Sequence, residues 1–128
     1  MSEIINFLTE DSIIMNCQSK SQKNALEVIS NKMAELTSTN KDEIFQKLYE
    51  REKLGTTAFG NGIAIPHARI EGIQNAKIIM LKLTEAIDFN SIDNSKVDII
   101  MSLFVPNDNN KMHIELLSKI ASLLDNQV

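Results

Sequence analysis

Hydrophobic residues recur along the chain at spacings that alternate between those typical of helices and those typical of strands. One set repeats at three- and four-residue intervals: Leu26, Ile29, Met33 and Leu36. This spacing places its members on one face of a helix, and Ser21 is a residue type that commonly caps a helix start. The pattern therefore predicts a first long helix that begins at about residue 21.

A second helix is predicted from Asn40 to about Leu54. Asn40 followed three residues later by Glu43 resembles the pattern that caps a helix start, and Gly55 is a typical helix end. The residues on one face of this helix are Ile44, Leu48 and Arg51. Because that face packs inward, Arg51 should emerge from it in the last turn and point toward the segment after Gly55.

Two near-continuous apolar runs, 77–83 and 97–105, follow in the second half of the chain. Such runs are typical of strands that helices cover on both faces. A shorter run from Ile13 to Met15 predicts a first strand, and an amphipathic turn over residues 4–8 precedes it. After Pro106 a third helix is predicted from apolar residues at helical spacing, which are Ile114, Leu117, Ala121 and Leu124. This alternation indicates an α/β fold with a mixed β-sheet sandwiched between helices.

The composition fits one domain and excludes some kinds of partner. A chain of 128 residues that is 43% hydrophobic can bury one core, so residues 1–128 are expected to form a single domain. The net charge of −4 and the absence of a basic run argue against nucleic acid. No apolar run reaches the roughly 18 residues of a membrane span. The acidic start is unlike a signal peptide and Cys17 is the single cysteine, so we expect a cytoplasmic protein without direct membrane insertion.

The stretch from Gly60 to Arg69 carries the candidate chemistry. Gly60 and Gly62 allow a tight backbone path, and Pro66 biases the residue before it toward an extended conformation. His67 is therefore expected at the end of a short strand, with its ring held out of the sheet. From a lone Pro-His pair, a structural or merely exposed histidine would be the more common outcome.

Arginine usage points to an anionic ligand at this histidine. Of the 13 Lys and Arg residues only Arg51 and Arg69 are arginines, and both lie close to His67 in sequence. A guanidinium group binds a phosphate or carboxylate in a fixed planar geometry, whereas lysine serves well as a solvated surface charge. The three residues together predict a site for a phosphate or a carboxylate.

The chain resembles the enzyme IIA proteins of the bacterial phosphoenolpyruvate phosphotransferase system, in the mannitol, fructose and nitrogen-regulatory class. The resemblance covers nearly the whole chain, and the residues that carry it are Gly55-Thr56-Thr57, Gly60 to His67, Asp88-Phe89, Asp93, Val105-Pro106 and His113. It implies one type-2 enzyme IIA domain of mannitol/fructose-like fold, in which His67 carries the phosphoryl group. Members usually continue with a further C-terminal helical segment, which we expect this chain to lack.

The resemblance also suggests roles for residues around His67. Arg51, Arg69 and His113, which falls in the first turn of the third helix, are expected to bind the phosphate, with no metal and no cofactor. Phe59 and Ile63 are candidates for docking a partner protein, although core burial explains either residue equally well. Further residues are interpreted as turn or strand residues more readily than as catalytic groups: Thr56, Thr57, Asp88 and Asp93.

The predicted function is that of a phosphoryl carrier, which accepts the group on His67 from a histidine-containing phosphocarrier protein. The unfused domain and its Gly60-Asn61-Gly62 sequence favour nitrogen and metabolic regulation, with regulatory target proteins as partners. The alternative is a fructose- or mannitol-type sugar uptake protein that passes the group to an enzyme IIB. A metal site on His67 and His113 and an interaction domain without chemistry are less favoured.

Overall fold

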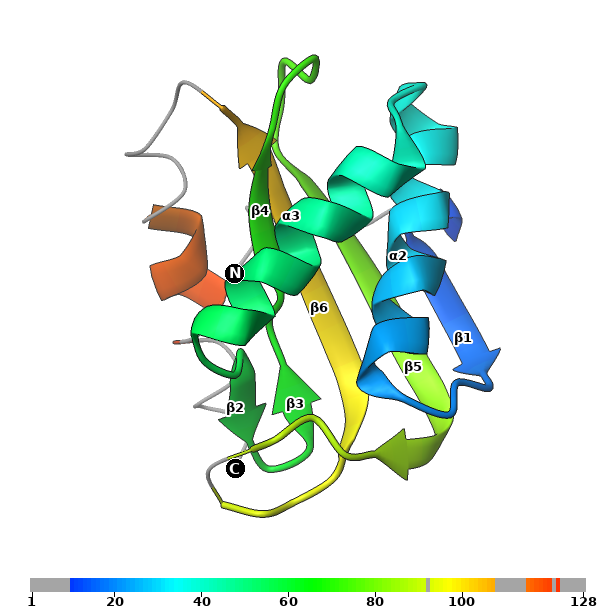
Figure 1. The fold of residues 1–128 in the computed structure, drawn as a ribbon, viewed down its shortest axis with the longest axis vertical. Coiled ribbons are helices and arrows are strands. Elements are labelled where there is room, and N and C mark those ends of the chain that lie inside the picture. Colours follow the sequence, from blue (N-terminus) through cyan, green and yellow to red (C-terminus); the bar gives the residue numbers. More distant parts are fainter. Residues whose placement is uncertain (1–9, 92, 108–114, 121, 123–128) are drawn as a thin grey trace.

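The computed structural model describes residues 10–91, 93–107, 115–120 and 122, without the side chain of Phe59. Two long helices cross one face of a sheet (Figure 1). In chain order the elements are η1 (Glu10–Ser12), β1 (Ile13–Cys17), α2 (Gln22–Thr37), α3 (Lys41–Leu54), β2 (Ala58–Gly60), β3 (Ile63–Ala64), β4 (His67–Ile70), β5 (Lys77–Ile87) and β6 (Val97–Pro106). Residues 115–120 are also helical. The turn predicted over residues 4–8 lies outside the described residues.

The sheet is mixed, as the sequence predicted. Its strand order is β1-β5-β6-β3-β2, and β4 pairs with β6 beyond β3. The central pair, β5 and β6, is antiparallel, while β1 runs parallel to β5. Both β3 and β4 run parallel to β6, and β2 is antiparallel to β3. Strands β3 and β4 therefore follow one another along the same edge of β6. Strand β2 pairs with β3 on the side away from β6.

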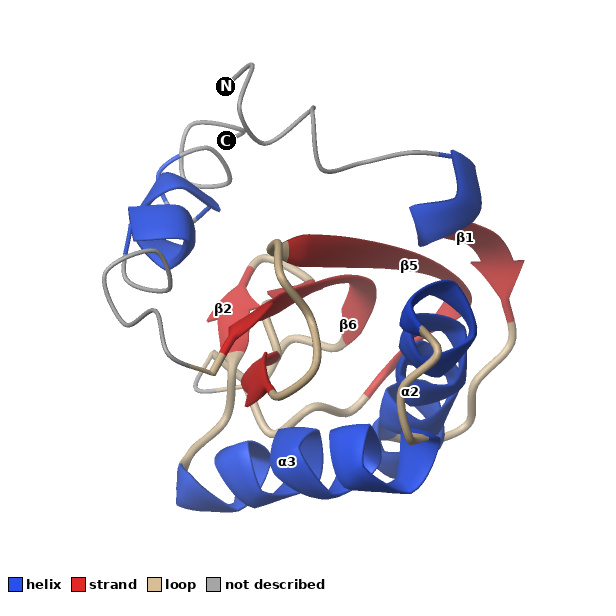
Figure 2. Ribbon diagram, turned by 90° about the horizontal axis from the view of Figure 1, so that it is seen from above, coloured by secondary structure: helices blue, strands red, loops and turns tan. Residues whose placement is uncertain are grey.

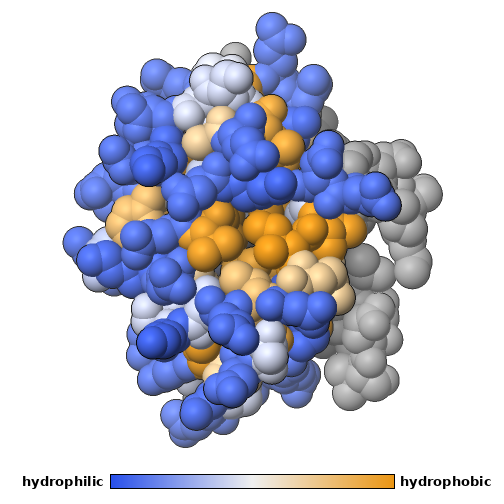
Figure 3. Space-filling model, turned by 90° about the vertical axis from the view of Figure 1, so that its right-hand side faces the viewer, coloured by the Kyte–Doolittle hydropathy of each residue, from blue (hydrophilic) through white to orange (hydrophobic). Residues whose placement is uncertain are grey.

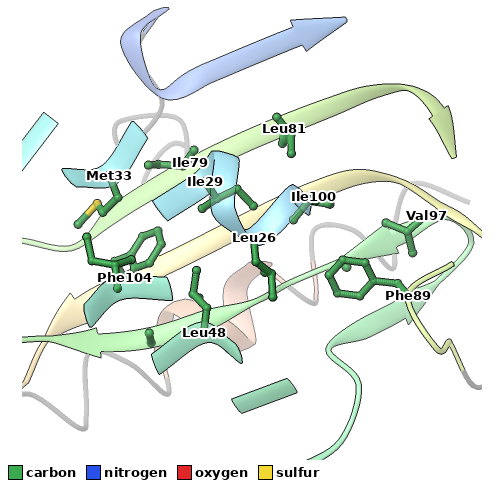
Figure 4. Close-up of a cluster of buried hydrophobic side chains, with 14 of the residues drawn as sticks. Leu26, Ile29, Met33, Leu48, Ile79, Leu81, Phe89, Val97, Ile100 and Phe104 are labelled. Carbon is green, nitrogen blue, oxygen red and sulfur yellow. The ribbon is translucent and has the colours of Figure 1, made fainter. Parts of the chain in front are cut away.

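Helices lie on both sides of strands β5 and β6, with α2 and α3 along one face and the helical residues 115–120 on part of the other (Figure 2). Alternate side chains face α2 and α3 and form the larger core (Figure 4), including Ile79, Leu81, Ile100 and Phe104. The intervening side chains, which include Ile78, Leu103 and Val105, point to the other face. They pack there against Leu116 and Ile120 of the helical residues 115–120. The prediction that helices cover both faces of these strands is therefore confirmed.

Local hydrogen bonds fix the starts of the two long helices at the capping residues that the sequence predicted. The Ser21 hydroxyl accepts from the backbone N–H of Asn24 at 3.1 Å. Asn40 Oδ1 accepts from the N–H groups of Asp42 at 2.8 Å and Glu43 at 3.2 Å. These acceptors satisfy backbone donors that the first turn of a helix leaves without partners.

In its described part, the C-terminal helical segment packs the predicted Leu117 against the core, together with two residues that the prediction did not name. In the described part, Leu116 and Ile120 are buried and Leu117 is partly buried. The prediction placed Leu117 in the inward row, with the other members of that row outside the described residues. The sequence is apolar at 116, 117 and 120, so its periodicity alone does not show which of these residues is buried most deeply. In the structure, Leu116 and Ile120, four residues apart, are the more deeply buried.

The strand that carries His67 was predicted wrongly. His67 begins β4, whereas the sequence placed it at the end of the preceding strand. Ala64 in β3 pairs with Ile100 of β6, and His67 pairs with Leu103 three residues further along. Pro66 has no N–H, but its carbonyl accepts from Leu103 N at 2.9 Å. The chain therefore stays beside β6 through the proline and resumes its pairing at His67.

A tight turn joins β2 to β3 and is fixed by the loop between β5 and β6. Gly60, Asn61 and Gly62 all have positive φ, at 104°, 56° and 84°. A Cβ on Gly60 would lie 3.3 Å from Asp93 Oδ2, and the same oxygen accepts from Asn61 N at 3.2 Å. The backbone angle at position 60 favours glycine, and a Cβ there would also press on the Asp93 carboxylate.

Asp88 and Asp93 are turn residues, in agreement with the interpretation of the sequence. Asp88 Oδ1 accepts from Asn90 N at 2.9 Å. Asp93 Oδ1 accepts from the hydroxyls of Ser91 at 2.6 Å and Ser95 at 2.7 Å. These hydrogen bonds, from Ser91 first and then Ser95, hold the pKa of Asp93 well below its usual range. The two carboxylates are thus occupied in shaping the loop.

Strand β1 ends the sheet on the side opposite β2 and is irregular. Its pairing with β5 shifts register between Ile14 and Cys17, where Asn16 has a φ of 55°. Met15 is 59% exposed. The side of the molecule that carries β1 and α2 has a band of apolar side chains between hydrophilic ones (Figure 3). This edge therefore combines apolar side chains with a bulged backbone.

Candidate functional site

An open hollow of about 800 Å³ lies between the last turns of α3 and strand β4. Helix α3 and β4 are neighbours in space (Figure 1). The lining residues come from these two elements: Lys47, Glu50, Arg51, Lys53, Leu54, His67, Ala68 and Arg69. The hollow therefore contains His67 and both arginines of the chain.

Contacts at both ring nitrogens help to hold the imidazole of His67. Nδ1 lies 3.0 Å from the carbonyl oxygen of Ile65. Arg51 Nε donates to His67 Nε2 at 3.2 Å. A carbonyl can only accept, so Nδ1 must carry the proton, and Nε2 accepts through its lone pair. Both contacts are satisfied together only by the neutral Nδ1–H tautomer.

The surroundings of His67 favour this neutral form. Burial of the ring lowers the pKa of His67 below its ordinary value, and the positive charge of Arg51 lowers it further. The hydrogen bond to the Ile65 carbonyl acts in the opposite direction but does not outweigh burial. At neutral pH the ring is thus an uncharged base with its lone pair on Nε2, which is the form that acts as a nucleophile.

Arg51 is held at the end of α3 by a second contact. Its Nη1 donates to the carbonyl oxygen of Gly55 at 2.8 Å, and Gly55 N donates to the Glu52 carbonyl at 3.1 Å. The helix end therefore orients the guanidinium toward His67. The predicted direction of Arg51, toward the segment after Gly55, is confirmed.

Arg69 approaches the hollow from β4. It lies two residues after His67, so both side chains point to the same side of the strand. Arg69 is exposed and lines the hollow together with His67 and Arg51. The structure thus brings together three of the four residues predicted to form the phosphate site, and the fourth, His113, lies outside the described residues.

Of the two predicted docking residues, the structure describes the side chain of Ile63 only. Ile63 is half-buried in β3 and is not among the residues that line the hollow. Phe59 belongs to β2, and its side chain lies outside the described part of the structure.

The hydroxyl of Thr56 donates to the Phe89 carbonyl, and the hydroxyl of Thr57 donates to the Glu52 carboxylate. Both threonines therefore serve the local structure, as the preferred interpretation of the sequence had it.

Five of the residues that line the hollow were not singled out as site residues from the sequence: Lys47, Glu50, Lys53, Leu54 and Ala68. Lys47 and Lys53 add positive charge from α3, and Leu54 is 85% exposed at its last turn. A signal for them exists, because Lys47 lies one helical turn before Arg51 and Leu54 directly precedes the helix-ending Gly55. Only Glu50 opposes the cations among the lining residues, so the hollow favours an anion.

Among the described residues, no three or more side chains of His, Cys, Asp and Glu gather in a group that could hold a metal ion. None of the helices described is both long and apolar enough to cross a membrane.

Comparison with known proteins gives consistent matches. The family model described as "Phosphoenolpyruvate-dependent sugar phosphotransferase system, EIIA 2" matches residues 6–128. The nitrogen regulatory protein of Pseudomonas aeruginosa is 41% identical over 126 residues, 98% of this chain and 82% of that protein. The crystal structure of nitrogen regulatory protein IIA-Ntr from Neisseria meningitidis matches with a TM-score of 0.87 at 32% identity, covering 94% of this chain and 82% of the other. The 2-O-alpha-mannosyl-D-glycerate-specific EIIABC component of Escherichia coli is 27% identical over 97% of this chain and 19% of its own length.

Proposed function

Because the chain belongs to the EIIA 2 family of the phosphoenolpyruvate-dependent sugar phosphotransferase system, we propose that it is a phosphoryl carrier that holds the group on His67. The observation that carries this proposal is the ring of His67, fixed by Ile65 and Arg51 in one neutral tautomer inside a basic hollow. A phosphoryl carrier needs a neutral nitrogen nucleophile, cations that accept the incoming charge, and an open approach for partner proteins. This arrangement supplies all three.

The proton on Nδ1 selects Nε2 as the attacking atom. The lone pair of Nε2 forms a bond to the phosphorus of the phosphocarrier's phosphohistidine, while the bond from that phosphorus to the donor nitrogen breaks. The donor nitrogen keeps the electron pair. The Ile65 carbonyl, 3.0 Å from Nδ1, stabilises the positive charge that develops on the ring as Nε2 is phosphorylated.

Arg51 serves two states of the site in this mechanism. Before transfer its Nε–H occupies the Nε2 lone pair, so the guanidinium must move off that atom as the phosphoryl group arrives. The contact of Nη1 with Gly55 keeps the group near the ring during this change. Arg51 and Arg69 then bind phosphate oxygens, and each charge-assisted hydrogen bond contributes on the order of 1.5 to 3 kcal/mol.

We assign the chain to the regulatory branch of the family. The nitrogen regulatory relative is 41% identical and the chain covers most of it, whereas the sugar-specific relative is 27% identical and far longer. The partners proposed are a histidine-containing phosphocarrier protein as donor and regulatory target proteins. The sugar-uptake alternative would instead require transfer from His67 to an enzyme IIB.

Transfer itself tests the proposed function. Incubation with phosphoenolpyruvate, enzyme I and a phosphocarrier protein should add one phosphate that is labile in acid and stable in alkali, because a phosphoramidate behaves so and a phosphoester does not. Intact-mass measurement before and after acid treatment follows the group. A phosphate that survives acid, or no mass increase with an active donor, would contradict the proposal. Addition of a fructose- or mannitol-type enzyme IIB separates the branches, since the regulatory assignment expects little loss of phosphate to it.

The rate of acceptance should depend on pH in a way set by His67. A protonated ring has no lone pair at Nε2, and burial lowers the pKa of His67 below the ordinary value of 6.5. Acceptance should therefore decline at a lower pH than it would with an ordinary imidazole as the acceptor. The unfolded chain binds the proton more readily than the folded one, so the contribution of His67 to stability also decreases as the pH drops below 6.5.

An NMR titration of the His67 ring, beside melting curves across the same range, measures this prediction directly. The titration does not depend on the donor protein, whose own histidine also changes charge with pH. A midpoint for His67 at or above 6.5 would contradict it.

A further inference from the structure

The carboxylate of Glu52 lies beside the site but outside the hollow, and it collects several donors. Gln22 Nε2 donates to Glu52 Oε2 at 3.0 Å, and the backbone N–H of Thr57 donates to the same oxygen at 3.1 Å. The Thr57 hydroxyl donates to Oε1. These donors come from the first turn of α2 and from the segment between α3 and β2. Glu52 therefore ties three parts of the chain together at the end of α3.

One route leads from this carboxylate to Nδ1 of His67. Thr57 is only 9% exposed, and both its hydroxyl and its N–H are held by Glu52. Its carbonyl accepts from Ile65 N at 2.9 Å. The carbonyl of Ile65 in turn is the acceptor for His67 Nδ1. The position of the group that fixes the tautomer thus depends on Thr57, and Thr57 depends on Glu52.

A second route leads to Nε2. The backbone carbonyl of Glu52 accepts from Gly55 N, and the carbonyl of Gly55 accepts from Arg51 Nη1. Arg51 is adjacent to Glu52 in α3 and contacts Nε2 through its Nε–H. This route starts at the backbone of Glu52, and the carboxylate bears on it by fastening the end of α3 to Gln22 and Thr57.

We propose that Glu52 is a positioning residue for phosphoryl transfer: it holds Thr57 and the end of α3 so that His67 keeps its Nδ1–H tautomer and Arg51 faces Nε2. This inference rests on the proposed function, since it gives Glu52 its role through His67. A carboxylate suits the place because it only accepts, and all the contacts to it are donors. Burial raises the pKa of Glu52, which is the cost of keeping a carboxylate here, and the bonds from Thr57 oppose that rise.

Glu52→Gln provides the main test, because it keeps the size of the side chain but turns one acceptor oxygen into a donor. The Thr57 hydroxyl must then reverse its role or a contact from Gln22 or Thr57 must be lost, and in either case the contacts lose their charged acceptor. We expect a larger population of the Nε2–H tautomer of His67, a pKa shifted back toward 6.5, and phosphoryl acceptance slower by roughly 10- to 100-fold. Glu27→Gln, at an exposed position on α2, is the matched control and should leave all these quantities unchanged.

The readout is the ¹⁵N spectrum of histidine-labelled protein, with His67→Ala used to assign the signals. This measurement needs no phosphoryl donor, so it judges the role of Glu52 even if His67 proves not to be the acceptor. A folded Glu52→Gln protein with an unchanged tautomer and pKa of His67 would overturn the proposal. A shifted tautomer together with undiminished transfer would overturn it as well.

Thr57 supplies the second pair of variants, which decides the matter should Glu52→Gln fail to fold. Thr57→Val removes the hydroxyl that Glu52 binds, while Thr57→Ser retains it. We expect the valine variant to shift the tautomer of His67 and to slow transfer, and the serine variant to restore both. Equal behaviour of the two variants would show that the hydroxyl contact with Glu52 does not position the ring.

Discussion

His67→Ala is expected to abolish phosphate acceptance from the phosphocarrier protein. Alanine has no nucleophilic atom at the place where Nε2 lies, and the cations of the hollow cannot replace the bond that Nε2 would form with phosphorus. Intact-mass measurement after incubation with the complete donor system should show no increase. A rise by one phosphate in this variant would mean that another residue accepts the group.

The loss must be separated from unfolding and from general loss of a histidine. His67 is half-buried and lies at the start of β4, so its replacement should lower stability only modestly, and a melting curve verifies this. His113→Ala is the matched control, because it removes the only other histidine of the chain. Our prediction for His113, as a phosphate contact, is slower acceptance of one phosphate in this variant, not its absence.

Arg51→Lys is expected to slow transfer by about tenfold or more while the protein stays folded. Lysine keeps a positive charge but loses the planar fork that contacts His67 Nε2 and the Gly55 carbonyl at once. A lost charge-assisted hydrogen bond of roughly 1.5 to 3 kcal/mol corresponds to about a 10- to 150-fold change in rate. Rapid-quench measurement of acceptance gives the rate.

Companion variants decide whether this effect belongs to the site. Arg69→Lys should also slow transfer, because Arg69 lines the same hollow from β4. Lys23→Ala, at an exposed position on α2, should not. Arg51→Gln removes the charge as well, so it should also raise the pKa of His67, which the charge of Arg51 now lowers. Unchanged rates in both Arg51→Lys and Arg69→Lys would mean that the two arginines are ordinary surface residues with no role in phosphate binding.

The elements that the sequence predicted well are those whose signals are local. The start of α2 at Ser21, the start of α3 at Asn40 and its end at Gly55 each depend on residues within one turn of the boundary. The start of β4 at His67 was missed because it depends on pairing with Leu103, far along the chain. Strand β5 also extends to Ile87, beyond the apolar run at 77–83. The extension was missed because Thr84 and Glu85 are polar.

The residues of the candidate site differ in the same way: some have a local signal in the sequence, and others depend on tertiary contacts. His67, Arg51 and Arg69 could be named because their types and sequence spacing suggest a phosphate ligand. The hydrogen bonds of Glu52 could not, since one of them comes from Gln22, thirty residues earlier and on another helix. A glutamate in the charged last turn of α3 resembles a solvated residue until the tertiary contacts are known.

The irregularity of β1 affects how this protein behaves when it is concentrated. An edge strand with exposed apolar residues offers a template on which a strand of another molecule could add. Here the left-handed Asn16 and the register shift between Ile14 and Cys17 interrupt the regular spacing of backbone donors and acceptors after two residues. An incoming strand would lose its hydrogen-bonded ladder at that point. We therefore expect this irregularity to disfavour edge-to-edge aggregation while leaving the apolar side chains of β1 in place.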